Sequence, residues 1–298
     1  MKKILLKNLK LFDKKNDKLV SASILINGEF IEDIFYLPSP SLEAEEMDLK
    51  GLIALPGLID SHTHFRLKLG DNKYNSDDFS SGSKACLSGG ITTFIDFTDG
   101  EERDPAKDLK KRMDEALGSV VDYSFHSVLK NLKGPKDIKA RFEKIKETGI
   151  NSIKIFTTYR ARGLMSDDES VCHILENAAK TKTLVCVHAE DECVINYNAV
   201  KNSDSREKIR YHNIIRDEFS ENSAVSRLLK LNEKFGAKIY FVHVSSHKSL
   251  LLINEYRKKG FEAYAETCPQ YIVFDESVYR RKDAFLYTFT PPLRSSRN

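Results

Sequence analysis

Four histidines and one lysine of this chain lie in or just after short apolar runs, the kind of segment that forms buried strands. They are His62, His64, Lys154, His188 and His243. His62 and His64 are two residues apart, and alternate side chains of a strand share a face, so both imidazoles can enter one cavity. Neutral imidazoles are good ligands for zinc and similar divalent ions. These residue types in this placement predict a metal site.

Lys154 brings a different chemistry. A buried ammonium beside other cations is costly, so its pKa should fall. A neutral lysine can take up carbon dioxide and become a carbamate, which is a carboxylate on a long stem. Such a group could bridge two metal ions about 3.5–4 Å apart, a spacing useful for hydrolysis. The alternative is a lysine that pairs with an acidic side chain of the fold, and spacing alone does not separate the two.

A scaffold must bring these distant residues together, and the sequence after Leu52 alternates between strand and helix. The expected strands are 53–60, 92–97, 122–128, 152–157, 183–188, 238–244 and 261–266. The expected helices are 78–88, 105–117, 136–148, 168–180, 221–235 and 246–259. This alternation predicts an α/β fold with parallel strands and crossover helices, a TIM-like (β/α)8 barrel that is incomplete because only seven strands are found. In a parallel barrel all the strand ends gather around one mouth.

Residues 1–53 have a different pattern, with short strands and no helix, and predict the N-terminal part of a small β-sandwich module. The runs 21–26 and 29–35 flank Asn27-Gly28, which is a strong two-residue hairpin signal. Pro38-Ser-Pro40 and the acidic patch 43–46 are interpreted as a break after these strands. The predicted domains are therefore 1–53 and a barrel over 54–298 that lacks its last strand.

Composition excludes several classes of protein. The 47 basic and 44 acidic residues leave a net charge of only +3, so no nucleic-acid or membrane partner is expected. No apolar run approaches the ~18 residues of a membrane span. The first residues lack the apolar stretch of about 7–15 residues that a signal peptide needs. Five cysteines without paired spacing fit a reducing cytosol, so we expect a cytoplasmic protein.

The motifs, taken in order, give the chain a resemblance to a known family. They are PGLIDSHTH (56–64), DDFSSGSKACLSGGITT (77–93), INSIKIFTTY (150–159), VHAE (187–190), HVSS (243–246), ETCPQY (266–271) and TPPLR (290–294). With them the chain resembles the cyclic amidohydrolases of the amidohydrolase superfamily, in particular the hydantoinase and dihydropyrimidinase branch. The resemblance runs through essentially the whole chain.

This resemblance implies a hydrolase that opens the cyclic amide bond of dihydropyrimidines or hydantoins. It implies that His62 and His64 hold one metal ion, that His188 and His243 hold the other, and that N-carboxylated Lys154 bridges them. The ions would be zinc, and their shared hydroxide would attack the amide carbonyl of a small cyclic substrate.

The resemblance also implies contacts with the substrate. Tyr159 would donate its hydroxyl to the oxyanion, although it could instead be a half-buried aromatic residue at a strand end. Thr290 stands where the family usually has a serine whose backbone contacts the ring imide. Members of the family suggest a homo-oligomer, either a tetramer or a dimer.

The family's general acid and base is an aspartate at the end of strand eight, and no such residue occurs before Asn298. We therefore expect a form truncated at its C-terminus, weakly stable, and inactive or nearly so by itself. Segments that complete the N-terminal β module would also lie beyond the last residue.

Two other functions remain open. Arg66 follows His64 by two residues, as in the His-x-His-x-Arg motif of dihydroorotases and allantoinases, where the arginine can bind a substrate carboxylate. Tyr159 and the pair Asp96-Phe97 favour the dihydropyrimidinase side instead. The second alternative is a non-catalytic, dihydropyrimidinase-like interaction protein. The filled ligand positions argue against that alternative, and the truncation argues for it.

Overall fold

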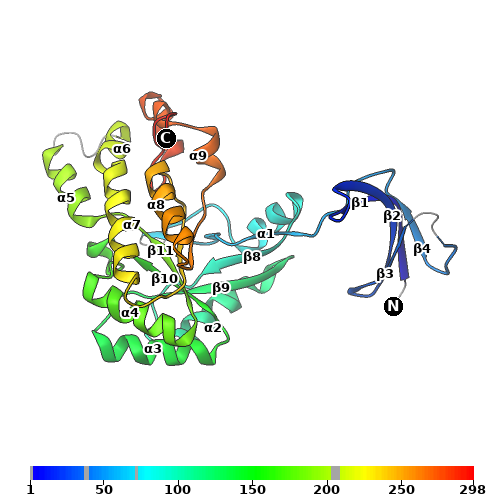
Figure 1. Cartoon of the computed structure of the whole chain (residues 1–298), viewed down its shortest axis with the longest axis horizontal. Coiled ribbons are helices and arrows are strands. Elements are labelled where there is room, and N and C mark those ends of the chain that lie inside the picture. Colours follow the sequence, from blue (N-terminus) through cyan, green and yellow to red (C-terminus); the bar gives the residue numbers. More distant parts are fainter. Residues whose placement is uncertain (1–2, 37–39, 71–72, 203–208) are drawn as a thin grey trace. The chain divides into compact units, whose positions relative to one another are not determined.

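The structure is a computed structural model that describes every residue except 1–2, 37–39, 71–72 and 203–208. The chain forms two compact units, Met1–Leu58 and Ile59–Asn298. Each unit has its own sheet, and the strands and helices of both are labelled in Figure 1.

The smaller unit is a four-stranded sheet in the order β3-β2-β1-β4. β1 (Lys3–Asp13) pairs antiparallel with β2 (Lys18–Asn27), which pairs antiparallel with β3 (Phe30–Tyr36). The predicted hairpin forms, but its two-residue turn is Gly28-Glu29 and not Asn27-Gly28, because Asn27 still pairs with Phe30. Gly28 has φ 62°, where a glycine is favoured. The interpretation of the acidic patch as a break was wrong, because β4 (Glu45–Asp48) pairs parallel with β1. All four of its side chains are exposed, so apolar periodicity could not reveal this strand.

The run expected as the first barrel strand, 53–60, divides between the two units. Backbone hydrogen bonds join Lys10 N to the carbonyl of Leu52 and Ala54 N to the carbonyl of Lys10, so the start of the run pairs with β1. Only β5 (Leu58–Asp60) joins the larger sheet. Pro56 and Gly57 separate the two parts, since proline cannot donate a ladder hydrogen bond.

The larger unit contains a seven-stranded sheet in the order β13-β12-β11-β10-β9-β8-β5. After β5 its strands are β8 (Ile91–Phe97), β9 (Asp122–Val128), β10 (Ser152–Phe156), β11 (Leu184–His188), β12 (Ile239–Phe241) and β13 (Ala263–Ala265). The pairs from β8 to β13 are parallel. Spatial order follows chain order, which confirms the predicted incomplete barrel architecture. β6 (Lys68–Gly70) and β7 (Lys73–Tyr74) form a separate antiparallel ribbon.

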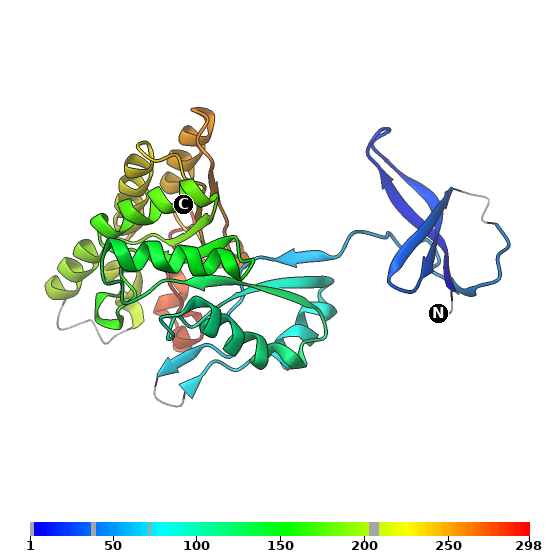
Figure 2. The same cartoon turned by 90° about the horizontal axis from the view of Figure 1, so that it is seen from below.

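Helices connect these strands, as Figures 1 and 2 show from two directions. The expected ones are α1 (Phe79–Ser88), α2 (Pro105–Glu115), α3 (Pro135–Glu147), α4 (Asp168–Thr181), α7 (Glu218–Asn232) and α8 (His247–Lys258). Three helices were not predicted from the sequence pattern: α5 (Glu192–Lys201), α6 (His212–Ile215) and α9 (Pro269–Val273). The missed α5 buries only Ile195, so it has no apolar stripe to detect. Among the described residues, none of the helices combines the length and apolar character needed to span a membrane.

Alternation along the central strands separates the core from the site. On β10, Ile153 and Ile155 are fully buried in the main apolar cluster, which the helices share. Lys154 lies between them in sequence and therefore points to the opposite face of the sheet. The parallel register places His188 of β11 beside Phe156 of β10, two residues after Lys154 and on the same face. The polar residues thus gather on the face that the helices do not cover.

The N-terminus of α4 offers a measurable test of local stability. Asp167 is its N-cap, and its carboxylate accepts a hydrogen bond from Ser170 N at 2.9 Å. We expect Asp167→Ala to lower the free energy of unfolding by about 1 kcal/mol, because a first-turn N–H loses its partner. Urea unfolding measures the loss. Glu169→Ala, at an exposed position of the same turn, should cost only a few tenths of a kcal/mol, and equal losses would contradict the capping role.

Candidate metal centre

His62 and His64 face each other just beyond β5, with their Nε2 atoms 3.1 Å apart. The sequence argument assumed that both histidines alternate along a strand. The structure places them in the loop after β5, so strand alternation does not bring them together. Their loop is held by Asp96 of β8 instead. Its Oδ2 accepts hydrogen bonds from Thr63 Oγ1 at 3.0 Å and from Phe65 N at 2.7 Å. The residues between and after the two histidines are therefore fixed to the neighbouring strand.

Asp96 is itself held by Arg112 of α2. The Nη2 atom of Arg112 lies 2.9 Å from Asp96 Oδ1 and donates to the carbonyl of Phe65 at 2.8 Å. Its Nε donates to the carbonyl of Phe97 at 3.1 Å. The two charged side chains are 2% and 1% exposed, so each compensates a charge that water does not reach. This ion pair supports the loop of the first imidazole pair.

His188 and His243 form a second facing pair, with His188 Nδ1 and His243 Nε2 separated by 3.1 Å. His188 is the last residue of β11, and His243 follows β12 by two residues in a left-handed conformation with φ 40°. The ring centroid of His243 lies 5.3 Å from that of His62, so the two pairs adjoin. The buried Nδ1 atom of His243 has no hydrogen-bond partner among the described residues.

Lys154 lies beside both pairs and is only 1% exposed. Its Nζ is 5.1 Å from the ring centroid of Phe97, which packs on His62, and 5.2 Å from that of Phe156, which packs on His188. Within the described part of the chain this nitrogen forms no hydrogen bond or ion pair. The structural alternative, a lysine paired directly with an acid, is therefore not what the contacts show. Burial lowers the pKa of Lys154 to about 8, which raises the fraction of neutral amine near neutral pH.

Burial also acts on the four histidines. It is the largest cause that lowers the pKa of His62, lowers that of His188 to about 4, and holds those of His64 and His243 well below the usual value. The nearby charge of Lys154 lowers all four pKa values further. The imidazoles are consequently neutral near pH 7 and keep lone pairs available for a metal ion.

Two carboxylates that sequence analysis did not assign orient these rings. Glu190 is fully buried and lies 2.6 Å from His188 Nε2, and Glu266 accepts from His62 Nδ1 and from Tyr240 Oη. Each carboxylate accepts a hydrogen bond from the ring nitrogen that points away from the facing histidine. The other nitrogen, His188 Nδ1 or His62 Nε2, then keeps its lone pair. The sequence did contain a signal for these two supporting carboxylates. Each is an acidic residue close to the end of an expected strand, in VHAE and at the start of ETCPQY.

The geometry of the imidazole pairs fits metal ligation. Two zinc–nitrogen bonds of about 2.0–2.1 Å at a tetrahedral angle place their nitrogens roughly 3.3 Å apart. Both observed separations are 3.1 Å. In the described part of the chain, no group of three histidine, cysteine or acidic side chains is placed to hold one metal ion. The candidate ligands are therefore the two histidine pairs, with Lys154 beside them.

The other residues singled out from the sequence fall into two places. Tyr159 has φ 68°, and its ring centroid lies 5.2 Å from that of His188. Burial raises the pKa of Tyr159, while a hydrogen bond with Thr290 opposes that rise, so these two residues are neighbours. Arg66 is exposed, and its guanidinium lies 5.1 Å from the ring centroid of Tyr74 in β7. The described contacts of Arg66 are thus with the β6–β7 side and not with the imidazole pairs.

His126 of β9 is buried and forms hydrogen bonds with both ring nitrogens. Its Nδ1 lies 2.6 Å from Ser152 Oγ, and its Nε2 lies 3.1 Å from the carbonyl of Ser61. Both ring nitrogens are occupied, so this histidine joins three strands or strand ends and offers no free lone pair.

The chain is similar in sequence to a known protein family and to hydantoinases. The model of the Amidohydrolase family matches residues 53–256. D-hydantoinase of Geobacillus stearothermophilus is 37% identical over 258 residues, which are 84% of this chain and 54% of that relative. D-phenylhydantoinase of Escherichia coli K12 is 31% identical over 299 residues, which are 95% of this chain and 62% of that relative.

Solved structures agree with these matches. A crystal structure of D-hydantoinase superposes with a TM-score of 0.90 at 33% identity, covering 99% of this chain and 64% of that one. A dihydropyrimidinase from Brevibacillus agri gives the same TM-score and coverage at 31% identity. The chain therefore spans between about half and two thirds of the length of the proteins it matches.

Proposed function

This chain belongs to the amidohydrolase family, and we propose that its histidine and lysine side chains hold two divalent metal ions for the hydrolysis of a cyclic amide. The proposed substrates are hydantoins or dihydropyrimidines, in keeping with the names of the relatives. The observation that carries the proposal is the two facing imidazole pairs beside buried Lys154, whose Nζ has no acid paired to it among the residues that the structure describes.

The chemistry divides between the ions and the protein. When bound, two zinc ions would supply a polarised water as nucleophile near neutral pH. His62 and His64 would hold one ion, and His188 and His243 the other. Lys154, as a carbamate, would bridge them, and its lowered pKa supports this because only a neutral amine takes up carbon dioxide.

Tyr159 would act on the substrate. Its hydroxyl stays protonated at neutral pH, since burial raises its pKa, and it can therefore donate a hydrogen bond to the oxygen of the attacked carbonyl. Thr290 lies next to it and would help to shape the position of the ring imide. Tyr159 follows the end of β10 and packs on His188.

Metal binding is the first test. The purified full chain should bind two equivalents of zinc, measured by plasma emission spectrometry after gel filtration. His64→Asn and His188→Asn should each remove one equivalent and leave the other. A wild-type chain that binds no zinc would contradict the proposal and favour the non-catalytic interaction protein.

Substrate preference is the second test. Because this chain is expected to be nearly inactive by itself, the assay uses a high protein concentration to detect slow turnover. The zinc-loaded chain should then open a 5-substituted hydantoin or dihydrouracil faster than dihydroorotate. The reverse order, together with a loss specific to dihydroorotate in Arg66→Ala, would favour a dihydroorotase-type function. Little is expected from Arg66→Ala otherwise, because that side chain lies on Tyr74.

Replacing the tyrosine hydroxyl should separate catalysis from metal binding. We expect Tyr159→Phe to lower kcat by about 10²–10³, the usual cost of removing one oxyanion donor, while the zinc content stays at the wild-type level. Tyr197→Phe is the control, since that ring is 66% exposed on α5. Equal rates in Tyr159→Phe and wild type would exclude the oxyanion role.

Two broader properties are also proposals. The five cysteines are all free, which supports a reducing, cytoplasmic setting. A homo-oligomer, a dimer or tetramer, is proposed from the family alone, and light scattering of the purified chain would test it.

A further inference from the structure

We propose that Arg216 is a positioning residue that joins the second imidazole pair to Tyr159. It touches neither ion position itself, and it acts through the groups that it contacts. The inference rests on the proposed function, because it concerns the metal position between His188 and His243. Arg216 is the C-cap of α6 and lies before α7, so it does not belong to a strand of the sheet.

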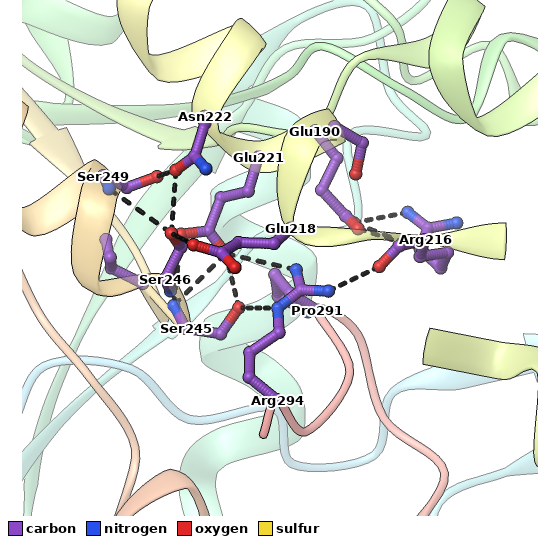
Figure 3. Close-up of polar contacts among 12 residues, drawn as sticks. Glu190, Arg216, Glu218, Glu221, Asn222, Ser245, Ser246, Ser249, Pro291 and Arg294 are labelled. Carbon is purple, nitrogen blue, oxygen red and sulfur yellow. Dashed lines mark hydrogen bonds and ion pairs between the residues drawn. The ribbon is translucent and has the colours of Figure 1, made fainter. Parts of the chain in front are cut away.

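The first contact is with Glu190. Arg216 Nε lies 3.1 Å and 3.2 Å from the two carboxylate oxygens, and Nη2 also donates to Oε2, so the guanidinium grips both oxygens (Figure 3). Glu190 is fully buried, and its Oε2 lies 2.6 Å from His188 Nε2. A planar fork fixes the orientation of a carboxylate in a way that a single point charge does not. The direction of Glu190, and through it the direction of His188 Nδ1, therefore depends on Arg216.

The second contact is with Tyr159. The guanidinium carbon of Arg216 lies 4.9 Å from the ring centroid of Tyr159, within the range of a cation–π contact. Tyr159 also packs on His188, with their centroids 5.2 Å apart. Arg216 thus influences the orientation of two groups. One is the imidazole of His188, which would hold a metal ion, and the other is the hydroxyl of Tyr159, which would bind the substrate.

The third contact fixes the backbone of Arg216. Arg294 Nη1 donates to the carbonyl of Arg216 at 2.6 Å, and Arg294 Nε donates to Ser245 Oγ at 3.0 Å. Ser245 lies two residues after His243, and its N–H and hydroxyl both donate to the buried Glu221 (Figure 3). The support of His188 is therefore tied to the turn that carries His243, which sets the spacing of the pair.

A neighbouring arginine provides a matched control. Arg227 lies 2.8 Å from Asp191, the residue after Glu190, and 3.1 Å from Asp168. It makes a similar ion pair at the same end of the sheet, but its described contacts are with these acids and with no member of the imidazole pairs. A change at Arg227 removes an ion pair of the same type without the connection to His188.

The experiment is a cobalt(II) titration of the full chain, followed by visible absorption. The wild type should bind two equivalents. Arg216→Lys should weaken one equivalent by about 10–100-fold, the usual cost of losing support for a metal-bound histidine, and leave the other unchanged. The weakened equivalent should be the one that His188→Asn removes. Arg227→Lys should leave both equivalents at their wild-type affinities.

A second variant covers the case in which Arg216→Lys does not fold, as judged by circular dichroism. Glu190→Gln keeps an acceptor for His188 but loses the charged grip of Arg216, and it should weaken the same equivalent. The double variant should be no weaker than the worse single one, because both act along one path. Equal weakening of both equivalents, or of neither, overturns the proposal in either variant.

The connection to Tyr159 has its own readout. At cobalt concentrations that fill both positions, Arg216→Lys should still lower kcat, and this loss should vanish in a Tyr159→Phe background. An equal loss in both backgrounds would remove Tyr159 from the proposal. A wild-type chain that binds no cobalt would instead overturn the proposed function, so the two failures are distinct.

Discussion

Replacing Lys154 with methionine should abolish the binding of both metal ions while the protein stays folded. Lys154 is 1% exposed and lies against the rings of Phe97 and Phe156, a setting that suits an apolar side chain of similar length. Methionine removes the amine that would form the bridging carbamate. It also removes a group whose charged form is penalised by burial, so the free energy of unfolding should not fall. Zinc content and urea unfolding measure the two effects.

The carbamate itself can be observed. The wild-type chain, incubated with carbon-13-labelled bicarbonate and zinc, should show a carbamate carbonyl signal in the nuclear magnetic resonance spectrum, and Lys154→Met should lack it. Lys139→Met is the control, because Lys139 is 71% exposed and pairs with Glu143 on the surface of α3. Retention of both zinc ions by Lys154→Met would contradict the bridging role.

Replacing Arg112 with methionine should give the largest loss of stability, about 3–5 kcal/mol in the free energy of unfolding. The substitution leaves the buried charge of Asp96 without its partner and the carbonyls of Phe65 and Phe97 without their donors. The loop that carries His62 and His64 should loosen as well, so the zinc equivalent that His64→Asn removes should bind more weakly. Urea unfolding gives the first number and zinc titration the second.

The same helix supplies the control for Arg112. Lys110 pairs with Asp114 on the outer face of α2, where their side chains are 72% and 53% exposed. Lys110→Met should change the free energy of unfolding by less than about 0.5 kcal/mol, because water screens this pair. Adding Asp96→Asn to Arg112→Met should restore part of the loss, since the lone buried charge is then removed. Equal costs for Arg112→Met and Lys110→Met would contradict the role of the buried pair.

Local patterns in the chain were sufficient for the order of elements and for the types of side chain at the site. Apolar runs that alternate with amphipathic helices predict parallel strands, and the connections of such strands place their ends at one edge. The neighbouring positions of His188 and His243 follow from that rule, whereas the facing of His62 and His64 depends on the loop that Asp96 holds. Local patterns failed where a strand or helix has no apolar periodicity, as in β4 and α5.

Tertiary structure alone decided which residues support the site. Glu266 binds His62 across 204 positions of sequence, and Arg216 reaches Glu190 across 26. Such pairs depend on how far each loop extends past its strand and on the register of neighbouring strands, and neither is encoded in a short window. A buried charge needs a partner wherever the fold places one, so the chemistry of the ligands could be read locally, whereas their orientation depended on the packed molecule.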